Sequence, residues 1–451
     1  MVIEIIIFIS LVLVMTLGDK VLLLKVLIIL LPFHLFIKNG LIYFVDGGTI
    51  FALWKELAVI VLLAKVLKTE RVTVKKEFIP LLAFFSLTVL LYFLFAKNLG
   101  DAIAQLRDHI FTIVLFIAMY SCPLNQKQAS EILNTFIVSA FLSCIGGLLQ
   151  QFMYNVPIST IKGSIDFIDE AGYIQYKTVS SRIMGLERMS GLFSGPNDFG
   201  LYCSFMLCVC IYALFNKNKI NVSPKLKPWI TVTLLLLFIC LLLSFSRAGW
   251  VLSIITIVYL VVTKAINFNP KIIIGIGLTL FVAATIIFIT VPKAADIINA
   301  SLSGKEASAA ARTGLLQKGM ETILSEPFGH GLATADSRSS RRDFFVESAF
   351  LNIAYEIGIV GLLSLIFFHL RIASNLRKAN KLRLSPFSSL AIGISIASLI
   401  VSFVSINPYG MPFIYLWWLI LGLGLNNINR SQFKFRKNEN QVLHYHSKHV
   451  S

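Results

Sequence analysis

Residues 229–264 read WITVTLLLLFICLLLSFSRAGWVLSIITIVYLVVTK, two apolar runs, free of charge up to Lys264, joined by the short turn SFSRAGW at 244–250. A run of about 20 apolar residues crosses a bilayer as a helix. In lipid every backbone polar group needs an internal partner, so only helices and closed barrels span a membrane. Continuous apolar runs lack the alternating pattern of a barrel. The stretch therefore predicts two membrane-spanning helices.

The same pattern extends over the whole chain. Hydrophobic residues make up 57% of its 451 positions and charged residues 14%, whereas a soluble protein has about a quarter charged residues. We expect an all-α fold, a polytopic transmembrane helical bundle of about 12–13 helices forming a single integral membrane domain over 1–451. Residues 1–18 lack a basic start and a cleavage site, so they predict a retained helix. The expected spans are 2–17, 20–38, 51–67, 78–96, 109–123, 132–154, 199–215, 229–245, 251–264, 272–292, 348–369, 387–404 and 411–425.

The net charge of +17 gathers between the predicted spans. Lysine and arginine concentrate in the breaks at 65–76, 217–227 and 371–383, and in the C-terminal tail at 426–451. Cytoplasmic loops of membrane proteins carry such an excess. We therefore expect a multi-pass protein of the cell (plasma or inner) membrane with a cytoplasmic C-terminus, and no nucleic-acid partner. The six cysteines show no metal-ligand spacing and are read as packing residues.

Two long loops then fall on the extracytoplasmic side, at 155–198 and 293–347. Within the second, 308–324 predicts a short helix lying on the outer surface. The chain has no nucleotide-binding glycine loop and no His/Cys metal cluster, so we expect no metal and no cofactor. Any chemistry would come from the outer loops and the adjoining helix ends, where four patches of residues stand out.

The first two patches combine an arginine with turn residues. RMSGLFSGPNDF at 188–199 leads into a span, and Asn197 or Asp198 can cap that helix. Such a capped helix start, with Arg188 at the headgroup level, is the plainer interpretation. In SFSRAGW, a tight turn explains Ser246 but not Arg247. Arg247 either reaches lipid phosphates or binds a substrate phosphate through two parallel hydrogen bonds.

The other two patches lie in and after the second long loop. Arg312 sits on the predicted surface helix, and EPFGHG at 326–331 follows, with His330 read as a turn residue. ESAFLN at 347–352 opens the next span, where Glu347 falls in the first helical turn and is favoured by the helix dipole. Glu356 lies deeper in that span. It either serves a functional site or hydrogen-bonds neighbouring helices together.

In this order, the four patches resemble the O-antigen ligase and O-antigen polymerase (Wzy-type) superfamily of bacterial envelope enzymes. The resemblance covers about residues 130–370. It rests on Arg188-x-x-Gly191-x-Phe193-x-x-Pro196-Asn197, Ser246-Arg247-x-Gly249, Arg312 ahead of Pro327-x-Gly329-x-Gly331, Glu347-x-x-Phe350-Leu351, and Glu356-x-Gly358.

The resemblance implies a glycosyltransferase that uses a polyprenyl-diphosphate-linked oligosaccharide (undecaprenyl diphosphate in bacteria) at the outer face, without metal or nucleotide. Membrane lipid is an expected partner, with a flippase and a chain-length regulator as further partners. Arg188 and Arg247 would hold the diphosphate during catalysis, and Arg312 would assist them. The other substrate-binding residues implied are Asn197, Ser246 and Glu356.

The chain departs from the family's ligases at Glu347, where they carry a histidine that activates the acceptor. A buried glutamate can take that role if its pKa rises; equally, the change can mark a different acceptor. Polymerases of the superfamily vary more at this position, so we favour a polymerase of cell-surface polysaccharide. A ligase that transfers the glycan to a final acceptor stays open. So does a secondary transporter or glycan exporter, although hydropathy shows no inverted repeat and the candidate residues gather at the outer face.

Overall fold

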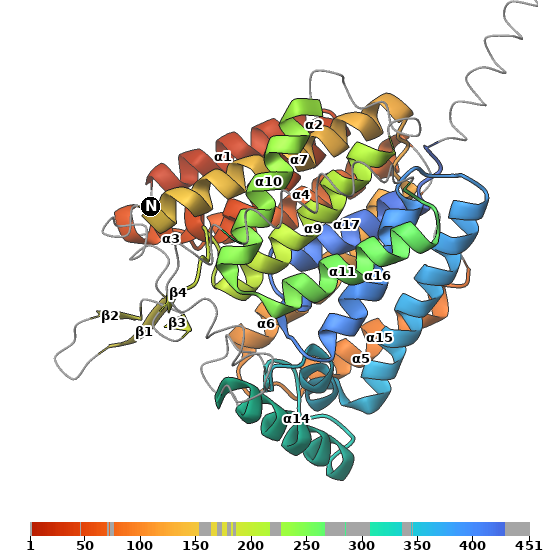
Figure 1. The fold of residues 1–451 in the computed structure, drawn as a ribbon. Coiled ribbons are helices and arrows are strands. Elements are labelled where there is room, and N and C mark those ends of the chain that lie inside the picture. Colours follow the sequence, from red (N-terminus) through yellow and green to blue (C-terminus); the bar gives the residue numbers. More distant parts are fainter. Residues whose placement is uncertain are drawn as a thin grey trace, which may run out of the picture.

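The structure is a computed structural model of the chain. It describes residues 2–45, 47–69, 72, 76–152, 164–168, 174–177, 182–183, 186–216, 227–266, 285, 307–335, 344 and 346–428. Within these ranges, long helices pack side by side into one bundle (Figure 1). The predicted fold class, a polytopic helical bundle, is confirmed.

The first third of the chain forms helices only, in its described part. They are α1 (Val2–Leu17), α2 (Lys20–Leu30), η1 (Leu31–Phe33), α3 (His34–Val45), η2 (Phe51–Leu53), α4 (Trp54–Thr69), α5 (Ile79–Phe93), α6 (Leu99–Ser121) and α7 (Gln126–Phe152). The remaining described elements are β1 (Ser164–Ile168), β2 (Ile174–Lys177), β3 (Arg182–Ile183), β4 (Leu186–Glu187), α9 (Pro196–Phe215), α10 (Lys227–Ser244), α11 (Arg247–Val262), α14 (Ala307–Ser325), α15 (Ala349–Lys381), α16 (Ser388–Ser402), η4 (Asn407–Tyr409) and α17 (Phe413–Leu425).

Six described helical segments are long and apolar enough to cross a membrane: Lys20–Ile42, Leu99–Ser121, Gln126–Gln151, Pro196–Phe215, Lys227–Ser244 and Ala349–Lys381. Shorter apolar helices pack beside them, namely α1, α5, α11, α16 and α17. Large apolar side chains also cover the outside of the bundle; Leu87 is 66% exposed and Leu94 77%. Such a surface suits lipid rather than water, and the chain is an integral membrane protein.

The predicted spans have counterparts in the described helices, apart from 272–292, which lies outside the described residues. Two boundaries differ most. Helix α6 begins at Leu99 rather than 109, and α15 runs to Lys381 rather than 369, so most of the basic residues predicted in the 371–383 loop lie on helix. The loop at 155–198 also contains two antiparallel β pairs, β1–β2 and β3–β4. The predicted surface helix is present as α14, which in Figure 1 lies across one end of the bundle.

Two helices form the centre of the bundle because they are apolar on every side. Helix α9 packs against α7, α10 and α11, and α17 packs against α6, α15 and α16. Nearly every residue of both helices is buried. The connections that enter these two central helices meet at one end of the bundle, because Asn407 in η4, ahead of Phe413, is hydrogen-bonded to Asp198 at the start of α9.

Helix α15 is broken at Gly358, whose φ of 74° and ψ of 166° are not helical. The backbone N–H of Ile359 donates to the Pro327 carbonyl over 3.0 Å, and that of His330 donates to the Tyr355 carbonyl over 2.8 Å. Few residues other than glycine adopt a positive φ readily. The break thus lets the segment that follows α14 dock against α15.

Candidate functional site

Arg188 lies directly against the 244–247 turn, so the structure brings the first two sequence patches together. Its Nε donates to the Ser244 carbonyl over 2.9 Å, and its Nη2 donates to Asn197 Oδ1 over 2.6 Å and to the Phe245 carbonyl over 3.3 Å. Three acceptors from two segments thus fix the plane of the guanidinium group. A planar cation held this way is oriented before any ligand arrives.

The start of α9 packs directly against the 244–247 turn and fixes it. A Cβ added at Gly200 would lie 2.3 Å from the Cβ of Ser246, so only glycine permits this approach. Ser246 caps α11, because its hydroxyl accepts the Gly249 N–H over 3.3 Å. Arg247 follows as the first residue of α11 and is exposed. Two guanidinium groups, those of Arg188 and Arg247, are therefore attached to one rigid turn.

The Ser405–Asn407 segment, which no sequence pattern marked as a candidate, contacts the starts of both α9 and α15. Asn407, in η4, donates from Nδ2 to Asp198 Oδ1 at the start of α9, and Ser194 donates to the other carboxylate oxygen. On its other side the Ser405 carbonyl accepts the Ala349 N–H at the start of α15, over 3.3 Å. Burial raises the pKa of the nearby Tyr409 phenol, which stays protonated. Asn-Pro-Tyr-Gly after an apolar run was the only sequence signal for this segment.

Glu347 is half-buried and lies one residue before the helix cap of α15, outside the first helical turn where we expected it. The cap is Ser348, whose hydroxyl accepts the Leu351 N–H over 3.3 Å and donates to the Ser402 carbonyl. Asn352 holds the preceding residue, Val346, by two hydrogen bonds of 2.9 and 3.2 Å. The backbone that carries Glu347 is thus fixed on both sides, at the end of α15 that contacts the Ser405–Asn407 segment.

Glu356 is buried in α15 and binds protein groups. Its carboxylate accepts hydrogen bonds from the Gln105 amide of α6 and from the Ala335 backbone N–H, the latter over 3.1 Å. Gln105 in turn accepts the Ala333 N–H over 2.6 Å. Among the described contacts, none links Glu356 to Arg188 or Arg247. Glu356 therefore joins α6, α15 and the segment after α14.

The two remaining predicted residues belong to the α14 region. Arg312 lies on α14, but its side chain is outside the described part of the structure. His330 stacks on the Tyr355 ring at 4.0 Å between centroids, and its Nε2 contacts a Glu326 carboxylate oxygen at 2.5 Å. These contacts make His330 part of a packed turn, as the sequence indicated.

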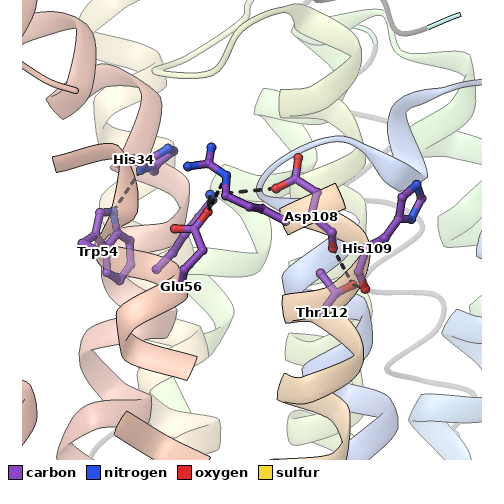
Figure 2. Close-up of polar contacts among 8 residues, drawn as sticks. His34, Trp54, Glu56, Asp108, His109 and Thr112 are labelled. Atoms are coloured by element: carbon purple, nitrogen blue, oxygen red, sulfur yellow. Dashed lines mark hydrogen bonds and ion pairs between the residues drawn. The ribbon is translucent and has the colours of Figure 1, made fainter. Parts of the chain in front are cut away.

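A second group of charged residues, which was not among the residues predicted from the sequence, is buried between α4, α6 and α17. Lys55 pairs with Glu56, and its Nζ lies 3.8 Å from Asp108 Oδ1; Arg107 Nε lies 3.7 Å from Glu56 Oε1. Figure 2 shows Glu56 and Asp108 facing each other from neighbouring helices, with Trp54 bonded to His34 beside them. The signal was charged residues at the edges of apolar runs: Lys55 and Glu56 lie near the start of the expected span 51–67, and Arg107 and Asp108 lie just ahead of the span 109–123.

Two cations, Arg188 and Arg247, lie at the 244–247 turn, where the starts of α9 and α11 are in contact. Helix N-termini and guanidinium groups both favour anions such as phosphate. Residues 232–366 match the family model described as O-antigen ligase. This match includes Arg247, Arg312, Glu347 and Glu356, and supports the O-antigen ligase and polymerase superfamily for this chain. No curated protein matches the chain.

Proposed function

With the match of residues 232–366 to the O-antigen ligase family model as the premise, we propose that this protein is a membrane glycosyltransferase that polymerises repeat units of a cell-surface polysaccharide. Its substrate is a polyprenyl-diphosphate-linked oligosaccharide, and it acts at the outer face of the cell membrane. The growing lipid-linked chain is transferred onto the sugar of a fresh lipid-linked repeat unit. The protein needs no metal, because arginine side chains take the role that a metal has in other glycosyltransferases.

One observation carries this proposal: Arg188 is hydrogen-bonded to the short turn that Arg247 follows. Arg188 is bonded to the carbonyls of Ser244 and Phe245, and Arg247 begins the helix that follows. A diphosphate carries negative charge on neighbouring phosphate groups, so two guanidinium groups held at one turn suit it. Asn197 and Ser246 contribute by holding this pair in place, and Arg312 assists from α14. Glu356 remains a predicted substrate-binding residue.

In the proposed reaction, a hydroxyl oxygen of the acceptor sugar attacks C1 of the donor sugar. The bond from C1 to the diphosphate oxygen breaks, and the diphosphate leaves with the bonding electron pair. The hydroxyl proton passes to the Glu347 carboxylate, which acts as general base. Negative charge grows on the leaving oxygen, and fixed guanidinium groups aimed at it stabilise the transition state. The loss of one such group typically lowers the rate about 100-fold or more.

The size profile of lipid-linked and surface glycan tests the proposal. The profile is compared between a deletion strain, the strain restored with the natural protein, and the strain restored with Arg247→Ala. We expect single repeat units in the deletion and Arg247→Ala strains, and long chains with the natural protein. Arg377→Ala is the matched control, because Arg377 is exposed near the opposite end of α15. This variant should give long chains.

Two other outcomes identify the alternatives. Full-length polymer that stays on its lipid and never reaches a final acceptor identifies a ligase. An unchanged glycan profile contradicts glycan joining and favours a secondary transporter. The buried ion pairs between α4 and α6 favour that second candidate, because paired charges inside a bundle often mark transport pathways. Lys55 and Glu56 lie in the first turn of α4, however, rather than near the middle of the helix.

A further inference from the structure

Burying the charged group between α4, α6 and α17 lowers the stability of the protein more than the packing of these side chains raises it. Lys55 and Glu56 are each 4% exposed and Asp108 is 7% exposed. Burying such charges costs several kcal/mol per ion, and well-packed apolar residues of the same volume often stabilise a protein equally well or better. Ionisable residues inside membrane bundles are accordingly rare and tend to serve ligands or ions. The group therefore calls for a functional explanation.

Three atoms of this group are buried without a hydrogen-bond partner among the described residues: Glu56 Oε2, Arg107 Nε and the Tyr415 hydroxyl. They lie together, because Lys55 bonds to Glu56, Arg107 Nε lies 3.7 Å from the same carboxylate, and Lys55 Nζ lies 5.7 Å from the centroid of the Tyr415 ring. Buried polar atoms nearly always have partners, so each exception points to something that supplies one.

The polarity of the three atoms defines the chemistry of that partner. Glu56 Oε2 accepts hydrogen bonds, Arg107 Nε donates, and a tyrosine hydroxyl does both. A phosphate or carboxylate ligand cannot donate to Glu56, and an ammonium ligand cannot accept from Arg107. A hydroxyl group donates and accepts, so it satisfies the set. The two sources of hydroxyl chemistry are sugars and ordered water.

The position of the group favours a sugar. Tyr415 lies in the first turn of α17, shortly after the Ser405–Asn407 segment that contacts the starts of α9 and α15. Arg107 is the least buried of the charged side chains, at 30% exposure, so it links the group to the surface of the protein. We propose that Glu56, Arg107 and Tyr415 form a second binding subsite for hydroxyl groups of the lipid-linked glycan. This inference rests on the proposed function, since it assumes that a glycan reaches this end of the bundle.

Tyr415→Phe is the cleanest test, because the hydroxyl it removes has no hydrogen bond within the described protein. A purely structural role predicts an unchanged or higher melting temperature and unchanged kinetics. The subsite predicts a KM for the lipid-linked repeat unit about three- to tenfold higher, the effect of one lost hydrogen bond. It also predicts a kcat within about twofold of the natural protein. Arg107→Lys, which keeps the charge and removes the Nε donor, should raise KM in the same way.

The assay uses the full-length protein in bilayer discs, with the single-repeat lipid-linked glycan extracted from the deletion strain as substrate. Tyr212→Phe is the matched control, since Tyr212 is an equally buried tyrosine of α9 whose hydroxyl donates to the Pro386 carbonyl. It should lower the melting temperature and leave KM unchanged. An unchanged KM in both Tyr415→Phe and Arg107→Lys overturns the subsite and assigns the three atoms to ordered water. If the natural protein itself elongates nothing, the proposed function has failed instead.

Discussion

Asn407 donates a hydrogen bond from its side-chain amide to the carboxylate of Asp198, across 209 positions of sequence. The bond joins the start of α9, which carries the Arg188 partner Asn197, to the segment that contacts the start of α15 beside Glu347. In the proposed reaction these two helix ends hold the diphosphate and the base. The Asp198–Asn407 bond therefore helps to set the distance between them.

We predict that swapping Asp198 and Asn407 keeps most of the stability and activity that either single substitution loses. Asn407→Asp places two carboxylates against each other, and Asp198→Asn removes the charge from a bond that is worth about 1.5–3 kcal/mol. Each single variant should melt several degrees lower and make shorter glycan. The double variant restores one amide and one carboxylate, and it should recover most of both losses. Additive losses in the double variant would show that the pair does not act as a unit.

Helix α6 shows which part of the fold could not be predicted from the sequence. Apolar runs predicted the spans because lipid selects for them at every position. They did not predict that α6 begins at Leu99, since Gln105, Arg107 and Asp108 interrupt the apolar run and were read as loop. Asn98 caps this helix by accepting the Gly100 and Asp101 N–H groups, and the charges of Arg107 and Asp108 are matched by α4. A charge paired with a distant helix cannot be told from a loop charge in one sequence.

The candidate site was predictable to the extent that local sequence encodes it. Turn and cap residues lie beside Arg188, Arg247 and Glu347 in the sequence. The turns and helix caps explain these small or hydrogen-bonding neighbours, so the three charged residues stand out. Asn407 and Tyr415 have no such mark, because their importance comes from what folds against them. The direct contact between Arg188 and the 244–247 turn likewise needed the structure, since these patches belong to different loops.

Arg247→Lys should lower glycan polymerisation strongly, although the positive charge is kept. A lysine ammonium is a point charge, whereas a guanidinium group offers two parallel N–H donors to one phosphate. We expect a rate loss of about 10-fold or more, and about 100-fold or more for Arg247→Ala. Rates are measured as repeat units joined per minute in bilayer discs. Full activity in Arg247→Lys would mean that only charge matters at this position.

Glu356→Gln tests whether this buried carboxylate serves the protein or the substrate. Both described partners, the Gln105 amide and the Ala335 N–H, donate to it. A glutamine offers one oxygen and one NH₂ group, so one donor would face another donor. We expect a loss of stability of about 1–3 kcal/mol, seen as a lower melting temperature with an unchanged KM below that temperature. A higher KM at unchanged melting temperature would instead support direct substrate binding.

The native cysteines should not react with maleimide in the folded protein, which makes the natural chain a ready background for topology mapping. All six cysteines are buried. Burial raises the pKa of the Cys122 thiol, beyond the end of α6, to about 11, so on the order of a thousandth of it is thiolate at pH 8. Added one at a time, Gly314→Cys on α14 should label in intact cells with a membrane-impermeant maleimide. Lys378→Cys, near the other end of α15, should label only after lysis, and the reverse pattern would invert the proposed orientation.

Gly358→Ala should separate the segment after α14 from α15. It should therefore reduce activity, although Gly358 is not part of the Arg188 and Arg247 site. The φ of 74° at Gly358 is costly for any residue with a Cβ, by about 1–3 kcal/mol. The added Cβ would also lie 3.0 Å from the Pro327 carbonyl oxygen, the acceptor of the Ile359 N–H. Gly314→Ala is the matched control, because α14 has nothing within 4 Å of a Cβ there and alanine favours a helix by about 1 kcal/mol over glycine. We expect Gly358→Ala to lower the melting temperature by several degrees and to speed proteolysis after α14, and Gly314→Ala to do neither. Equal protease resistance in the two variants would mean that the broken conformation of α15 is not what holds this segment in place.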